Sequence, residues 1–162
     1  MALDYLFDDA PEIGELKEVA PGIHWLRMPL PMALNHINLW LIEDGSGWTL
    51  IDTGLYSGLS KEIWNKVIDE QLGGRPLKRI IVTHFHPDHV GMAGWLVEKT
   101  DAEFWMPRTE WLYARVLTID TSEIFTDGMV EYYRRAGGDS EYLAKLKERG
   151  PFFPGIVSDV PR

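Results

Sequence analysis

The sequence predicts a mixed fold of the α/β (α+β) class, and three observations indicate it. Short apolar segments separated by turn residues predict a β-meander between Ile23 and Asp52. A segment of helical periodicity then leads to a further apolar strand at 80–82, and the chain becomes helical after residue 109. The order strand, helix, strand predicts a right-handed crossover, which places the next loop where open sheets bind their ligands.

The composition limits what the protein can be. A chain of 162 residues with 45% hydrophobic residues is long enough for one domain with its own core. The formal net charge of −9 argues against a nucleic-acid partner, and no apolar run approaches membrane-spanning length. Cysteine is absent, which excludes disulfides, thiolate metal sites and a cysteine nucleophile. The acidic N-terminus differs from a secretory signal, so we expect a cytoplasmic protein.

The first half of the chain alternates turns and strands. Residues 1–20 are mixed and acidic, and Pro11 and Gly14 interrupt any pattern, so we expect a loosely held N-terminal arm. Strands are expected at 23–28, 38–42 and 48–52. The two prolines of the 29–34 segment exclude a central strand there, which leaves a plain hairpin connection or a loop that overhangs a site.

A crossover helix follows the meander. Its apolar side chains recur at helical spacing: Leu59, Ile63, Trp64, Val67, Ile68 and Leu72. Ser57 or Ser60 can cap its N-terminus, and Gly73 with Gly74 would end it. After the strand at 80–82, residues 90–99 have a helical pattern with two glycines, and 102–106 form another short strand.

The last third of the chain predicts three helices, around 111–116, 124–133 and 140–146. Ser122 looks like a cap of the second helix, Gly137 and Gly138 separate the second from the third, and Asp139 or Ser140 can cap the third. Aromatic side chains at helical spacing usually pack between helices. We therefore interpret Trp111, Tyr132 and Tyr133 as packing residues in preference to pocket walls.

Four side chains that can bind a metal follow the apolar strand closely: His84, His86, Asp88 and His89. In extended chain, alternate residues point the same way, so His84 and His86 can bring two imidazoles to one cation. Asp88 and His89 come after the bend at Pro87 and can face a second position beside it. Neutral imidazole and carboxylate suit zinc, iron and manganese alike, and the spacing does not choose among them.

Residues 83–89, THFHPDH, resemble the H-x-H-x-D-H signature of the metallo-β-lactamase superfamily. Residues 50–54, LIDTG, resemble that family's strand ending in D-T-G, and 90–94 resemble its glycine-bearing helix start. The likeness runs from about residue 22 to 107. It implies an αββα sandwich with a mono- or dinuclear metal site that activates water. It also implies that Asp52 supports the metal loop by hydrogen bonding without being a ligand.

The resemblance implies a metal-dependent hydrolase that cleaves a small-molecule thioester, lactone, lactam or phosphoester. His84 and His86 would hold a first ion with a third histidine, and Asp88 and His89 would hold a second, with Asp88 also the catalytic proton carrier. We expect one or two zinc ions, with iron or manganese as alternatives. Two other functions remain open: an iron-dependent oxidoreductase of the same superfamily, and a non-catalytic, degenerate assembly module.

The chain departs from the family in its second half. It has no histidine after His89 and no second meander. We therefore interpret 21–108 as the N-terminal half of such a domain and 109–162 as a helical insertion and tail. Exposing several hundred Å² of inner sheet face would cost on the order of 10 kcal/mol at about 25 cal/mol per Å². A missing C-terminal half or a second copy is expected to cover that face. We therefore interpret the chain as a fragment of a longer hydrolase, and the rival interpretation is a naturally short or degenerate member of the family. The isolated chain is expected to turn over slowly or not at all.

Overall fold

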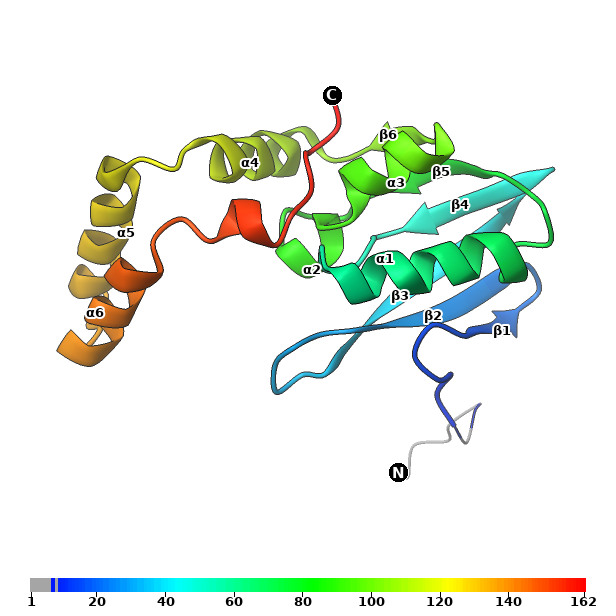
Figure 1. Ribbon diagram of the computed structural model, residues 1–162, viewed down its shortest axis with the longest axis horizontal. Helices are drawn as coiled ribbons and strands as arrows, with labels where there is room; N and C mark the ends of the chain where they lie inside the picture. The colour runs from blue at the N-terminus through cyan, green and yellow to red at the C-terminus, as the bar shows by residue number, and fades with distance from the viewer. Residues whose placement is uncertain (1–6, 8) are drawn as a thin grey trace, which may run out of the picture.

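The computed structural model describes Phe7 and residues 9–162 (Figure 1). Residues 1–6 and 8 of the predicted N-terminal arm lie outside the described part. The remaining chain forms a six-stranded sheet, helices that pack against it, and a helical extension. This arrangement confirms the predicted α+β class, in the form of one half of a sandwich.

The strands lie in the sheet in their order along the chain. They are β1 Leu16–Ala20, β2 Ile23–Pro29, β3 His36–Asp44, β4 Gly47–Ile51, β5 Leu77–Ile81 and β6 Glu103–Trp105. The first four pair antiparallel, which confirms the predicted meander, while β4, β5 and β6 pair parallel. The parallel part brings the carboxyl ends of β4 and β5 to the same edge of the sheet.

The expectation of a loosely held arm is wrong for residues Leu16–Ala20, which form the edge strand β1. Leu16 pairs with Leu26 of β2, and the backbone N–H of Leu16 donates to the side chain of Gln71 at 2.9 Å. The apolar residues of this segment, Leu16, Val19 and Ala20, do not alternate with its polar residues, so the sequence pattern contains no strand signal. Pairing with β2 and the distant Gln71 hydrogen bond stabilise it instead.

The crossover helix begins where predicted. Ser57 caps α1 (Gly58–Lys66) by accepting a hydrogen bond from the backbone N–H of Ser60 at 3.0 Å. The helix then widens into a π-helical turn, η1 (Val67–Gln71), before it ends near Gly73. The sequence predicted one uninterrupted helix over this stretch. The pattern of apolar residues does not reveal the wider turn, because the turn keeps the same apolar face toward the core.

The core lies between one face of the sheet and the helices α1 and α3, which Figure 1 shows lying across it. Leu26, Leu39, Leu41, Leu50 and Ile80 point toward them and are fully buried. Burying a large aliphatic side chain contributes about 1.5–3 kcal/mol, so the burial of this face stabilises the sheet substantially.

The other face of the sheet carries apolar side chains without a cover among the described residues. Trp40 and Trp105 are 37% and 54% exposed. Trp25 stacks on Trp40 across the β2–β3 pair, with ring centroids 6.2 Å apart. Surface tryptophans that share one face of a sheet indicate a surface that another element covers.

The segment after β5 contains two short helices, α2 (Pro87–Val90) and α3 (Ala93–Thr100), where the sequence predicted one. The break falls at Gly91 and Met92. An added Cβ on Gly91 would lie 2.6 Å from the backbone oxygen of Gly54, which belongs to the loop after β4. Gly91 packs so closely on this loop that the position requires glycine.

The helical extension forms as predicted. It comprises α4 (Arg108–Ile119), α5 (Glu123–Arg135) and α6 (Ser140–Arg149), and the predicted caps Ser122 and Asp139 accept from the third residue after each. In Figure 1, α5 and α6 lie side by side, away from the sheet. A 3-10 turn, η2 (Phe153–Gly155), then returns the chain to the core, where Val157 and Val160 are buried. Across the described residues, no helix combines the length and apolar character needed to cross a membrane.

Candidate metal centre

The histidine loop leaves the carboxyl end of β5. The backbone N–H of Val82 donates to Trp105 of β6 at 2.9 Å, which is the last ladder contact before the chain turns. Pro87 opens α2, where its missing N–H costs nothing and its fixed φ favours the helix. The segment 83–86 is therefore held between a strand end and a helix start, and its side chains project at the edge of the sheet.

The loop gathers three imidazole rings. The ring centroids of His84 and His86 are 4.5 Å apart, those of His84 and His89 are 3.9 Å apart, and those of His86 and His89 are 6.5 Å apart. Asp88 lies beside them, with a carboxylate oxygen 3.6 Å from Nε2 of His89. The four residues predicted from the sequence thus form one cluster, here called the histidine cluster.

Asp52 supports this cluster by hydrogen bonds to Thr83 and His89. It is buried at the end of β4 with a φ of 59°, a left-handed conformation that aspartate tolerates better than most residues. Its carboxylate accepts from the backbone N–H of Thr83 at 2.8 Å and from the Thr83 hydroxyl at 2.9 Å. It also contacts Nδ1 of His89 at 2.8 Å. When the ring proton of His89 is on Nδ1, the lone pair of Nε2, on the side of Asp88, is free to bind a metal ion.

The electrostatics favour an ionised carboxylate at Asp52 and a neutral imidazole at His84. Burial alone would raise the pKa of Asp52, but hydrogen bonds from His89 and Thr83 hold that pKa below its usual value. Burial lowers the pKa of His84, and the neighbouring rings of His89 and His86 lower it further. Neutral imidazole is the form that binds metals.

Further contacts hold the cluster in place, and the sequence reasoning missed them. The hydroxyl of Thr53 donates to the backbone oxygen of His89 at 2.7 Å, and the backbone N–H of Phe85 donates to Glu110 of α4 at 3.1 Å. Thr53 belongs to the DTG segment, so the motif contained a signal for it. Glu110 lies 25 residues beyond Phe85, and no local pattern could connect the two.

The other two histidines lie apart from the cluster. His24 of β2 contacts the ring of Trp48 edge-on at 5.0 Å, and His36 contacts the side chain of Asn35 at 2.8 Å. Both lie on strands of the meander.

The chemistry of the cluster suits a divalent metal ion. It offers three imidazoles and the carboxylate of Asp88, and the carboxylate of Asp52 contacts His89 from outside the cluster. Its donors do not complete a site. Among residues 7 and 9–162, no group of three or more histidine, aspartate or glutamate side chains is arranged to hold an ion. A complete centre therefore requires a shift of these side chains or further donors from outside the described chain.

Comparisons with known proteins give a consistent family. The sequence profile of the metallo-beta-lactamase superfamily matches residues 33–159. A beta-lactamase domain protein from Burkholderia ambifaria has a crystal structure that superposes with a TM-score of 0.76 at 37% sequence identity. A metallo-beta-lactamase family protein from Thermus thermophilus superposes with a TM-score of 0.67 at 23% identity, which supports the fold alone.

The coverage of these matches is unequal. They include 95% and 90% of this chain but only 44% and 46% of the two solved chains, so the chain spans less than half their length. The uncharacterized protein YobT of Bacillus subtilis (strain 168) is 40% identical over 62 residues, which are 36% of this chain and 24% of YobT.

Proposed function

The chain belongs to the metallo-beta-lactamase superfamily, and from this membership we propose that the histidine cluster is part of a zinc-type centre for hydrolysis. Membership itself indicates a metal-dependent hydrolase. The finer proposal is that one or two ions, zinc in preference to iron or manganese, serve the cleavage of a small-molecule thioester, lactone, lactam or phosphoester. The observation that carries it is the convergence of His84, His86 and His89 beside Asp88.

Each residue of the cluster has a distinct role in this proposal. His84 and His86 would hold a first ion, and Asp88 with His89 would hold a second. Asp52 keeps the proton of His89 on Nδ1 and so presents Nε2 as the donor atom. Asp88 would also accept and return a proton during hydrolysis. When bound, an ion of this class lowers the pKa of a water molecule to about 7 and polarises a carbonyl group.

We also propose that further polypeptide covers the apolar sheet face and completes the centre. Two findings support this: the chain spans less than half of the solved relatives, and Trp40 and Trp105 lie exposed on one face. The cover is either a C-terminal half of the same protein or a second copy of this chain. The missing ligands would come from that cover, because the described carboxylates and imidazoles do not complete a site.

The test is zinc binding to the purified chain and to two single variants, measured by isothermal titration calorimetry with metal analysis of the same samples. His84→Ala removes a proposed ligand, and we expect the Kd for zinc to rise at least tenfold. His36→Ala is the matched control, since it removes a histidine that lies outside the cluster, and it should leave the Kd unchanged.

Equal zinc binding by the chain and by His84→Ala would contradict the proposal. Iron in the purified protein in place of zinc would favour the oxidoreductase alternative over hydrolysis. Hydrolysis is tested with thioester and lactone substrates on zinc-loaded protein, where turnover should be slow in the isolated chain and lost in His84→Ala.

A further inference from the structure

A hollow of about 290 Å³ opens directly beside the histidine cluster. Its walls come from His86 of the loop, Tyr113 of α4, Phe125 and Met129 of α5, and the 149–153 segment, which begins at the last residue of α6. Parts of the chain that are far apart in sequence therefore meet at one edge of the proposed centre. Its volume lies just below the range of about 300–1,000 Å³ that is usual for small-molecule sites.

The hollow is lined mainly by aromatic side chains, and Met129 is the one sulfur-containing residue in its lining. The ring of Phe85 contacts Tyr113 edge-on, with centroids 4.5 Å apart, and also contacts His86 at 4.7 Å. A second hollow of about 490 Å³ shares Tyr113, Phe125 and Met129 with the first. Tyr133 also lines both hollows, and we call the two neighbouring hollows together the aromatic trough. Flexible methionine and flat aromatic walls favour an extended apolar group.

One cation lies at the rim of the trough. The guanidinium of Arg149 stands over the ring of Phe152 at 4.0 Å from its centroid. No carboxylate in the described part of the chain pairs with Arg149 within ion-pair distance, although the chain carries a net charge of −9. A guanidinium that is stacked on an aromatic ring and lacks an acidic partner is suited to bind an anionic group of a ligand.

We propose that the aromatic trough binds the apolar acyl or aryl group of an anionic substrate. In this arrangement the scissile carbonyl lies toward His86, the apolar group lies against Phe125 and Met129, and Arg149 contacts the substrate's negative charge. This inference rests on the proposed function for the position of the reacting group. The binding of apolar anions by the trough can be measured without any metal.

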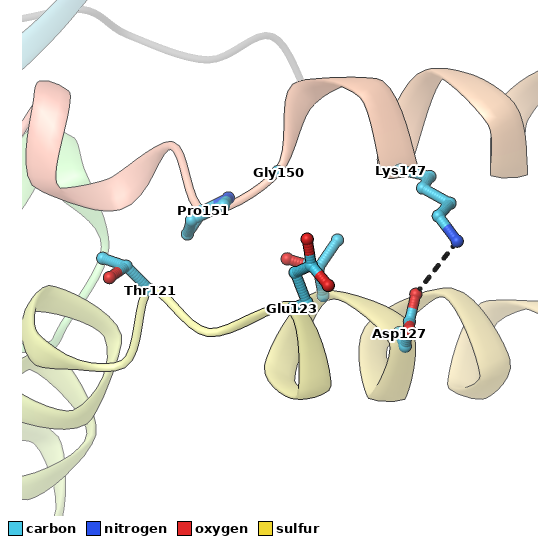
Figure 2. Close-up of a pocket in the computed structure, with 7 residues that line it drawn as sticks. Thr121, Glu123, Asp127, Lys147, Gly150 and Pro151 are labelled. Atoms are coloured by element: carbon cyan, nitrogen blue, oxygen red, sulfur yellow. Dashed lines mark ion pairs between the residues drawn. The ribbon is translucent and has the colours of Figure 1, made fainter.

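A third hollow, between α5 and α6, has a different character and does not compete for this role. Figure 2 shows Glu123 and Asp127 of α5 facing the Lys147 and Pro151 side of this hollow, with Lys147 paired to Asp127 at 3.2 Å. Its cation is already neutralised, and its lining lacks the aromatic walls of the trough. It also contains no residue of the histidine cluster.

The experiment uses two fluorescent probes that differ by a single charged group. 1-Anilinonaphthalene-8-sulfonate is an aromatic anion, and N-phenyl-1-naphthylamine is its neutral counterpart. Both are titrated into the metal-free chain and into Phe125→Ala and Arg149→Gln, with circular dichroism to verify folding. We expect Phe125→Ala to raise the Kd of both probes at least threefold, and Arg149→Gln to raise only that of the sulfonate.

Trp40→Ala is the matched control, because it removes an exposed aromatic side chain that lies on the uncovered sheet face and outside the trough. It should leave the difference in Kd between the two probes unchanged. A selective loss of sulfonate binding in Arg149→Gln would support the proposed contact between Arg149 and the negative charge of the substrate. Unchanged sulfonate binding in that variant, unchanged binding of both probes in Phe125→Ala, or no probe binding at all would overturn the proposal. Zinc titration is a separate readout, so a chain that binds the probes as expected but no zinc would contradict only the proposed function.

Discussion

Asp52 connects more parts of the candidate centre than any of the proposed ligands does. Its carboxylate contacts the backbone and hydroxyl of Thr83 and the ring of His89, and its own backbone stands at a φ of 59°. The proposed ligands are exposed to different degrees, whereas Asp52 is buried. The orientation of His89 therefore depends on a residue that lies 37 positions earlier in the chain.

Asp52→Asn is expected to weaken zinc binding about 10- to 100-fold, because an outer carboxylate orients a ligating histidine and raises its basicity. It should also lower the free energy of unfolding by about 1–3 kcal/mol, since a buried charge-assisted hydrogen bond is lost. Calorimetric zinc titration and urea unfolding measure the two effects.

Asp101→Asn is the control for this substitution, as Asp101 also has a positive φ, of 56°, but lies at the end of α3 away from the cluster. Asparagine tolerates the left-handed conformation, so the backbone effect is matched between the two sites. Wild-type zinc affinity in Asp52→Asn, or an equal loss in Asp101→Asn, would show that Asp52 does not position His89.

The residues of the site were predictable from sequence to the extent that they lie in local motifs. His84, His86, Asp88 and His89 follow a strand end within six residues, and the structure brings them together. Their role as metal ligands remains a prediction. Arg149 and Glu110 reach the same region through the packing of the helical extension, and that packing depends on contacts over tens of residues that no local periodicity encodes.

At the scale of elements, α3 is held by the returning tail. The hydroxyl of Ser158 donates to the backbone oxygen of Gly91 at 2.7 Å and accepts from the backbone N–H of Gly94 at 3.0 Å. The tail backbone passes so close that a Cβ on Gly94 would lie 1.8 Å from the oxygen of Asp159. Gly94 packs on the tail, and Gly91 packs on the loop after β4.

Gly94→Ala is expected to destabilise the protein by about 1–3 kcal/mol, because the added methyl group forces the tail away from α3. Gly128→Ala is the matched control, since Gly128 lies inside α5 with nothing within 4 Å of its added Cβ. That control should stabilise the protein by about 0.5–1 kcal/mol through helix propensity. Thermal unfolding of both variants measures the difference, and equal melting temperatures would contradict the close packing of the tail.

The elements also show where periodicity is informative. The caps at Ser57, Ser122 and Asp139 were predicted from residue type and position, and each accepts the expected hydrogen bond. Strand β1 was missed because its stability comes from pairing with β2 and from Gln71, not from its own composition. Local chemistry thus predicted helix starts well, while edge pairing depends on partners elsewhere in the chain.

At the scale of the whole molecule, the distribution of apolar surface is unbalanced. One face of the sheet is buried under α1 and α3, while the opposite face presents Trp25, Trp40 and Trp105 without a cover in the described residues. Large contiguous apolar patches are uncommon on monomeric proteins and indicate interaction surfaces. The helices and the histidine cluster are in place on one half of a sandwich, and on our proposal the second half comes from other polypeptide.

The isolated 162-residue chain is therefore expected to self-associate through its sheet face. Sedimentation velocity at increasing protein concentration should show dimers or larger species. Trp40→Lys should shift the distribution toward monomer, since a charge in the middle of the apolar face opposes its burial. Ile124→Lys is the matched control, because Ile124 is 85% exposed on α5, away from the sheet. A chain that stays monomeric, or an equal shift in both variants, would mean that the sheet face is not the association surface. In that case only a covalently attached C-terminal half would remain as the proposed cover.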